Sequence, residues 1–229
     1  MRFAGKVVSR RRLLQTFPLA AVSRVRAAGA NEKLVVACMG IRGRGNSLLQ
    51  GFAALPNVEV AVVCDVDTRG CDRRLAAVEE RQGRRPRTVT DFRRILDDPS
   101  IDALVMGTPD HWHAIPAILA CQAGKHVYVE KPAGHNLREG KLMLAAARRY
   151  NRVMQVGIQS RNGRHIAEAC EYIRQGGIGK VVLAKAWESA KQKSIGHPPD
   201  GPVPEGVDYD LWLGPAPARP FNTNRFHGH

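Results

Sequence analysis

The sequence contains no run of about 20 apolar residues, the length that a helix needs to cross a bilayer. It therefore predicts no transmembrane helix. Its five cysteines form no C-x-x-C pair and are odd in number, so we expect neither a disulfide framework nor a zinc site. Cys38 and Cys64 lie within apolar runs, where a free cysteine packs as a small hydrophobic residue.

Acidic residues are also scarce, since 21 Asp and Glu stand against 35 Lys and Arg and give the 229-residue chain a net charge of +14. Such an excess of basic residues is a feature of many nucleic-acid-binding proteins. Half of it lies in residues 1–33, where eight basic residues stand against the single acid Glu32, a net +7. The remaining excess is dispersed and lacks interleaved aromatic residues. The sequence therefore does not favour a nucleic-acid-binding protein.

The basic N-terminal segment has the form of a twin-arginine export signal. Residues 9–15 are Ser-Arg-Arg-Arg-Leu-Leu-Gln, a modest apolar stretch extends to Val22, and Ala28-Gly29-Ala30 offers a small-residue cleavage site. A disordered basic arm is the alternative interpretation. The first interpretation makes residues 1–30 a signal peptide and predicts a folded protein exported to the periplasm or the extracellular space.

Apolar runs alternate with helical patterns from residue 34 onward. We expect strands at 34–39, 58–64, 88–90, 101–107, 124–130 and 153–156, and helices at 46–55, 68–82, 91–96, 114–123 and 137–150. Asn136 and Glu139 have the spacing of a capping box for the last of these helices. This alternation predicts the α/β class, with a doubly wound parallel sheet over residues 31–156.

The character of the sequence changes after residue 156. A helix ending at Gly176, a strand at 181–187 and a Pro- and Gly-rich stretch at 198–220 are expected there. These elements are too few for a self-sufficient domain. We therefore expect residues 157–229 to form an incomplete α+β domain.

A glycine-rich turn, Gly40-Ile41-Arg42-Gly43-Arg44-Gly45, follows the first expected strand and precedes a helix. Backbone amides and a helix N-terminus in such a turn favour a phosphate. The turn departs from G-x-G-x-x-G because Arg42 occupies the place of the second glycine, although a guanidinium can itself contact a pyrophosphate oxygen. Taken alone, the turn fits either a dinucleotide site or a merely tight turn.

Asp65 ends the second expected strand, near the spacing from Gly40 at which an acid accepts hydrogen bonds from an adenosine ribose. A carboxylate there disfavours the additional phosphate of NADP, so NAD is the expected cofactor. Arg69 leaves NADP open as an alternative. Asp65 could also cap the following helix, a role that Asp67 or Thr68 could fill equally well.

The stretch from Gly124 to Gly134 places Glu130 and Lys131 at the carboxyl end of the fifth expected strand. Open α/β sheets bind their ligands outside these strand ends. A solvated loop would explain Glu130 and Lys131 equally well if they stood alone. However, Gly40, Asp65 and Thr108 also fall at strand ends, and this convergence favours a site.

Asp110, His111 and His113 could suggest a metal site. The three residues are too close in sequence to form a complete site by themselves, and Asp110 is a natural cap for the next helix. We therefore expect no metal.

Together these segments resemble the Gfo/Idh/MocA oxidoreductases, NAD(P)-dependent enzymes that act on sugars, inositols and related polyols. The matching segments are Gly40–Gly45, Cys64-Asp65-Val66-Asp67, Gly107-Thr108-Pro109 with His113, Gly124-Lys125-His126, Glu130-Lys131-Pro132, and Gln155-Val156-Gly157 leading to Arg161. Asp110–His113 and Trp212–Pro215 are similar to an exported bacterial branch of that family.

The resemblance implies that Lys131 lies beside the nicotinamide and the substrate hydroxyl, as a hydrogen-bond donor or a member of a proton relay. It implies that Glu130 orients the nicotinamide ribose or the lysine, and that Gln159 or Arg161 lies near the substrate. In such families the Lys131-Pro132 bond is often cis. The implied cofactor-binding residues are Gly40, Ile41, Arg42, Gly43, Arg44, Gly45, Asp65, Thr108, Pro109, His113, Glu130 and Lys131.

Members of this family carry a catalytic histidine in the later half of the second domain, and His227 and His229 do not match its motif. We therefore expect a C-terminally truncated chain. The first hypothesis is an oxidoreductase acting on a sugar or polyol, which would be a homo-oligomer at full length. The second is a glycoside hydrolase that uses NAD transiently, and the third is a non-catalytic nucleotide-binding remnant.

Overall fold

The computed structural model describes residues 33–159, 161, 163–187 and 194–226. The expected signal peptide at 1–30, and the two histidines His227 and His229, lie outside the described residues. In the described part of the chain, no helix has the length and apolar character required to cross a membrane.

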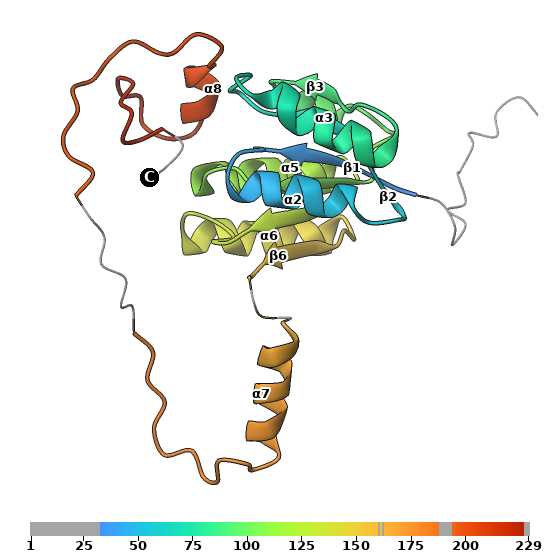
Figure 1. Ribbon diagram of the computed structural model, residues 1–229, viewed down its shortest axis with the longest axis vertical. Coiled ribbons are helices and arrows are strands. Elements are labelled where there is room, and N and C mark those ends of the chain that lie inside the picture. The colour runs from blue at the N-terminus through green and yellow to red at the C-terminus, as the bar shows by residue number, and fades with distance from the viewer. Residues whose placement is uncertain (1–32, 160, 162, 188–193, 227–229) are drawn as a thin grey trace, which may run out of the picture. The chain divides into compact units, whose positions relative to one another are not determined.

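Six parallel strands form one sheet in the order β3-β2-β1-β4-β5-β6 (Figure 1). The strand order reverses beside β1, as in doubly wound sheets. The predicted α/β fold is therefore confirmed, with each of these strands within two residues of its expected bounds. The strands are β1 (Leu34–Met39), β2 (Val58–Cys64), β3 (Arg87–Val89), β4 (Ala103–Met106), β5 (His126–Glu130) and β6 (Met154–Gly157).

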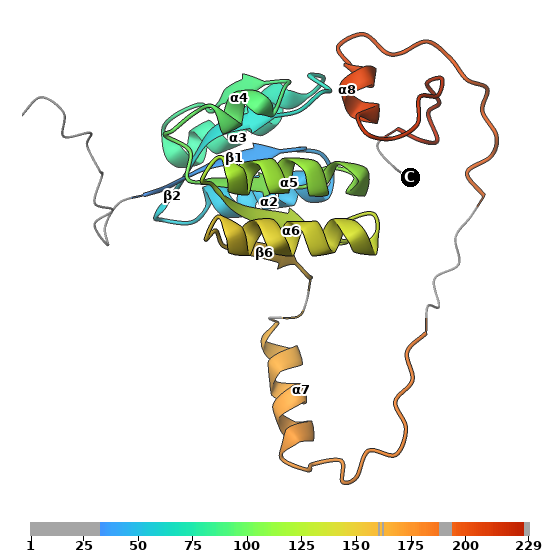
Figure 2. The same cartoon turned by 180° about the vertical axis from the view of Figure 1, so that it is seen from behind.

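Helices cover both faces of the sheet (Figures 1 and 2). Alternate residues of β1 divide between the two cores: Val36 and Cys38 pack on the side of α2 and α3, while Ala37 and Met39 pack on the side of α4, α5 and α6. A fully buried leucine such as Leu49 contributes roughly 1.5–3 kcal/mol through burial. The helices are α2 (Arg44–Ala53), α3 (Cys71–Gln82), α4 (Arg93–Leu96), α5 (Ala114–Gln122) and α6 (Leu137–Arg149).

The expected helix caps were correct at one helix of three. At α6, Asn136 Oδ1 accepts a hydrogen bond from the N–H of Glu139 at 3.0 Å, while the Glu139 carboxylate accepts from the N–H of His135 rather than of Asn136. The caps expected at α3 and α5 were wrong. Helix α3 begins after Gly70 and α5 after a short 3-10 turn, η2 (Asp110–Trp112), and neither has a side-chain cap.

The strand expected at 181–187 is wrong, because these residues form no strand. Val182 and Trp187 expose 87% and 79% of their surface. A strand is stabilised by hydrogen bonds to a neighbouring strand, which a β-branched run alone does not supply. The helix expected before Gly176 is confirmed as α7 (Arg164–Arg174), which buries none of its residues.

A short helix, α8 (Tyr209–Leu213), lies in the stretch that was expected to be irregular. Its N-cap is Asp208, whose carboxylate accepts a hydrogen bond from the N–H of Leu211 at 2.9 Å. A helix of this length is unstable alone. Packing among Tyr209, Leu213, Phe221 and Phe226, which are all buried, stabilises it.

Candidate active site

The glycine-rich turn brings three backbone segments into direct contact. A β-carbon on Gly45 would lie 1.8 Å from the carbonyl oxygen of Gly40, and one on Gly107 would lie 2.5 Å from the α-carbon of Gly45. Gly40 itself has φ +72°, a conformation that glycine adopts readily. Only glycine fits these positions. Gly107 was not among the predicted site residues, although its place at the end of an apolar run was a signal for it.

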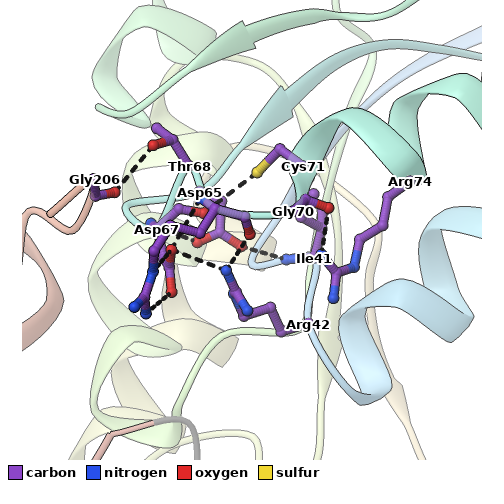
Figure 3. Close-up of polar contacts among 10 residues, drawn as sticks. Ile41, Arg42, Asp65, Asp67, Thr68, Gly70, Cys71, Arg74 and Gly206 are labelled. Carbon is purple, nitrogen blue, oxygen red and sulfur yellow. Dashed lines mark hydrogen bonds and ion pairs between the residues drawn. The ribbon is translucent and has the colours of Figure 1, made fainter. Parts of the chain in front are cut away.

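Arg42 turns toward the loop after β2 (Figure 3). Its guanidinium forms an ion pair with Asp67 at 2.9 Å and donates a hydrogen bond to the carbonyl oxygen of Arg69. The Asp67 carboxylate is fully buried and also accepts hydrogen bonds from Nε and Nη2 of Arg69, each at 2.8 Å. Asp67 therefore holds two arginines beside the turn, a role that the sequence interpretation missed.

Asp65 joins the glycine-rich turn to the end of β2. One carboxylate oxygen accepts a hydrogen bond from the N–H of Ile41 and the other from the N–H of Asp67, both at 2.9 Å (Figure 3). A carboxylate has about four acceptor positions. The geometry therefore leaves acceptor capacity for the ribose hydroxyls that this residue was predicted to bind.

Glu130 lies at the end of β5 and is 4% exposed. Its carboxylate accepts hydrogen bonds from Arg44 Nε at 2.8 Å, from Gln159 Nε2 at 3.2 Å and from the N–H of Lys131 at 3.3 Å. The bond to this carboxylate raises the pKa of the Arg44 guanidinium. Glu130 thus connects the first turn of α2 to the segment after β6, and it contacts the backbone of Lys131.

Lys131 follows on the same edge of the sheet, and its side chain is exposed. The Lys131-Pro132 bond is cis, as the resemblance implied. The turn is tied to the loop after β4 by His113, which is 1% exposed and whose ring nitrogens lie 2.6 Å from the Pro132 carbonyl oxygen and 2.9 Å from that of Thr108. His113 therefore positions two loops of the site, and its direct contact with a cofactor stays a prediction.

The two residues expected near the substrate differ in their surroundings. Gln159 reaches the Glu130 carboxylate, so it belongs to the same group of contacts. Arg161 is exposed. A substrate contact by either residue stays a prediction.

A pocket opens between the carboxyl ends of β1, β2 and β4. Asp65, Thr108 and Pro109, all predicted as cofactor-binding residues, contribute to it together with Gly40 and Arg42. Its lining is completed by Met39, Cys64, Val66, Thr90, Asp91, Phe92, Trp112, Leu211 and Trp212. Glu130 and Lys131 lie further along the sheet edge and do not line it.

The residues present fit a dinucleotide. The Gly40–Gly45–Gly107 contact removes side chains where a pyrophosphate must approach the backbone. Two polar atoms on residues that line the pocket, Arg42 Nε and Thr108 Oγ1, are buried without a hydrogen-bond partner among the described residues. Buried polar atoms are normally paired, so these two are available to a ligand.

The described residues contain no group of three or more His, Cys, Asp or Glu side chains that could hold a metal ion. The histidines of the Asp110–His113 segment have other partners. His111 Nε2 lies 2.9 Å from the carbonyl oxygen of Trp212, and His113 contacts the two carbonyl groups described above.

Residues 34–158 match a protein-family model described as an oxidoreductase family with an NAD-binding Rossmann fold, Gfo/Idh/MocA. Residues 186–229 match the C-terminal alpha/beta domain of the same family. The family match therefore identifies residues 34–158 as a Rossmann domain of the NAD-binding type.

Curated relatives include one enzyme named as a dehydrogenase and one named as a glycosidase. A levoglucosan dehydrogenase from Pseudarthrobacter phenanthrenivorans is 38% identical over 108 residues, which are 47% of this chain and 28% of that protein. An alpha-N-acetylgalactosaminidase from Shewanella oneidensis is 27% identical over 159 residues, which are 68% of this chain and 35% of that protein. The chain thus spans about a third or less of the length of these two relatives.

Solved structures with the same fold include a myo-inositol 2-dehydrogenase from Lactobacillus plantarum and a levoglucosan dehydrogenase in complex with NADH. The first has a TM-score of 0.59 at 24% identity and covers 66% of this chain and 44% of its own. The second has a TM-score of 0.56 at 31% identity and covers 65% and 41%. Since one family model alone matches more than half of its residues, the chain belongs to the Gfo/Idh/MocA oxidoreductase family.

Proposed function

We propose that the chain forms the cofactor-binding part of an NAD-dependent oxidoreductase that transfers a hydride between the nicotinamide and a sugar, inositol or related polyol. One observation carries the proposal: Lys131 lies at the end of β5, on the same sheet edge as the glycine-rich turn, and its neighbour Glu130 is bonded to Arg44 of that turn. The names of the levoglucosan dehydrogenase relatives support the substrate class.

NAD, when bound, supplies the acceptor for the hydride of a carbinol carbon. The chain must then bind the hydroxyl of the same carbon and carry its proton away as the carbonyl forms. Lys131 Nζ forms no hydrogen bond or ion pair with the described residues. It is therefore free to contact the substrate hydroxyl and to relay the proton.

A second candidate is an NAD-dependent glycoside hydrolase, which would oxidise the sugar, eliminate the leaving group, add water to the sugar and reduce the product again. Several relatives that carry glycosyl hydrolase family 109 names support it. The same lysine and the same cofactor site would serve both reactions. The difference lies in whether the reduced cofactor accumulates.

The two candidates are separated by one experiment on the 229-residue chain. The chain is incubated with NAD and either levoglucosan, myo-inositol or a chromogenic N-acetylgalactosaminide, while NADH absorbance and chromogen release are followed. NADH formation from a polyol supports the dehydrogenase, and chromogen release without net NADH supports the hydrolase. If NAD binds and neither signal rises above a Lys131→Ala control, both proposals for this chain are wrong.

A further inference from the structure

A C-terminal segment, Gly206–Gly214, is bonded to the loop after β2. The N–H of Asp208 donates to the carbonyl oxygen of Val66 at 2.9 Å, and Asp67 and Val207 form an antiparallel bridge. The backbone N–H and the hydroxyl of Thr68 both donate to the carbonyl oxygen of Gly206, at 2.9 and 3.0 Å (Figure 3). This end of the segment is therefore held beside Asp65 and Asp67.

The other end of the segment is bonded to the loop after β4. Trp112 Nε1 donates to the carbonyl oxygen of Leu211 at 2.8 Å, and His111 Nε2 lies 2.9 Å from that of Trp212. Gly214 packs against the indole so closely that a β-carbon there would lie 2.1 Å from the Trp112 ring. The segment therefore spans the two loops that flank the pocket.

Leu211 and Trp212 themselves line that pocket, beside Asp65, Thr108 and Pro109. Trp212 Nε1 is buried and, like Thr108 Oγ1, has no hydrogen-bond partner in the described part of the chain. The ring of Trp212 is held in place by Tyr209, which stacks on it with the centroids 5.6 Å apart. A flat apolar ligand with acceptor atoms at its edge would fit beside these residues.

We propose that Leu211 and Trp212 form one wall of the adenosine pocket, so that this segment of the C-terminal domain completes the NAD site. The Asp65 carboxylate, directly after β2, marks the ribose end of the pocket, and adenine is the part of NAD that is both flat and rich in edge acceptors. The inference rests on NAD binding by the family fold but not on the reaction proposed above. Packing of the segment for stability alone is the competing explanation.

Hydrogen exchange on the unmodified chain tests the inference. ADP-ribose and NAD should slow exchange of the backbone amides in 207–214 as well as in the glycine-rich turn, whereas nicotinamide mononucleotide should leave 207–214 unchanged. Protection of the turn without protection of 207–214 would overturn the inference and leave NAD binding intact. Absence of any binding by calorimetry would overturn both.

Substitutions give a second measurement. Leu211→Ala should weaken the calorimetric affinity for NAD and for ADP-ribose by about fivefold or more, because apolar contact surface is lost. Leu183→Ala is the matched control, since Leu183 belongs to the same C-terminal part but is 68% exposed and does not line the pocket. Trp212→Phe, which keeps an aromatic ring but removes the unpaired N–H, should also lower the affinity for NAD and for ADP-ribose. Wild-type affinity in folded Leu211→Ala and Trp212→Phe proteins would contradict the inference.

Discussion

Arg44 Nε donates a hydrogen bond to Glu130 Oε1 at 2.8 Å, which ties the first turn of α2 to the end of β5. The Glu130 side chain is 5% exposed and the Arg44 side chain is 44% exposed. A buried carboxylate that loses a charged donor is costly, whereas an exposed ion pair contributes little. This contact therefore joins the glycine-rich turn to the backbone segment that carries Lys131.

The first prediction concerns that pair. Arg44→Ala should lower the free energy of unfolding by about 1–2 kcal/mol, less than for a fully buried pair because the arginine is half exposed. Urea unfolding measures the change. Arg84→Ala is the control, since Arg84 is 77% exposed and pairs with Glu59 at the surface. Equal losses in both variants would show that the Glu130 contact is no stronger than a surface pair.

The second prediction concerns Gly45. Gly45→Ala should weaken NAD binding more than about tenfold, because its β-carbon would lie 1.8 Å from the Gly40 carbonyl oxygen and force the turn to move. Gly51→Ala, on the same helix with open space around the position, should leave the affinity unchanged. Calorimetric titration with NAD measures the affinity of both variants. Similar affinities would show that the close backbone contact between Gly45 and Gly40 is not required for NAD binding.

The sequence was sufficient to predict the sheet, because its central strands, such as β1 and β4, are short apolar runs buried on both faces. It was also sufficient to predict that Gly40, Asp65, Thr108 and Glu130 lie along one sheet edge, since parallel strands share their carboxyl ends. The expected strand at 181–187 failed because a β-branched run does not show whether a partner strand exists.

Two parts of the site could not be predicted from local pattern. Leu211 and Trp212 are about 100 positions away from Trp112, whose indole N–H donates to their carbonyl groups. Hydrophobic periodicity in a sequence does not indicate so distant a contact. Asp67 was weighed only as a helix cap because a buried carboxylate and an exposed one look the same in sequence. Its burial depends on Arg42 and Arg69 folding over it.

The third prediction concerns Lys131. Lys131→Ala should reduce turnover by about a hundredfold or more, as loss of a proton-transfer group does, while the affinity for NAD stays close to that of the wild type. Lys141→Ala removes an exposed lysine from α6 and should change neither quantity. Turnover is followed with whichever substrate the function assay identifies. Normal turnover in Lys131→Ala would remove this residue from the mechanism.

The last prediction concerns Asp98 and the acid dependence of stability. Hydrogen bonds from the Ser100 side chain and N–H, at 2.6 and 2.9 Å, together with the Arg87 guanidinium hold the pKa of Asp98 below its usual range. A lowered folded-state pKa means that the unfolded chain binds the proton more readily, so the stabilisation is present above the ordinary carboxyl pKa of about 4 and is lost as the pH falls through the folded-state value.

Asp98→Asn should therefore lower the free energy of unfolding by about 1 kcal/mol at neutral pH, and the difference from the wild type should shrink as the pH falls below about 4. Ser100→Ala should act in the same direction with a smaller effect, because Arg87 still contacts the carboxylate. Urea unfolding across this pH range measures both variants. A difference that grows as the medium becomes more acidic would mean that the folded protein favours the protonated form of Asp98, the reverse of what the Ser100 and Arg87 contacts predict.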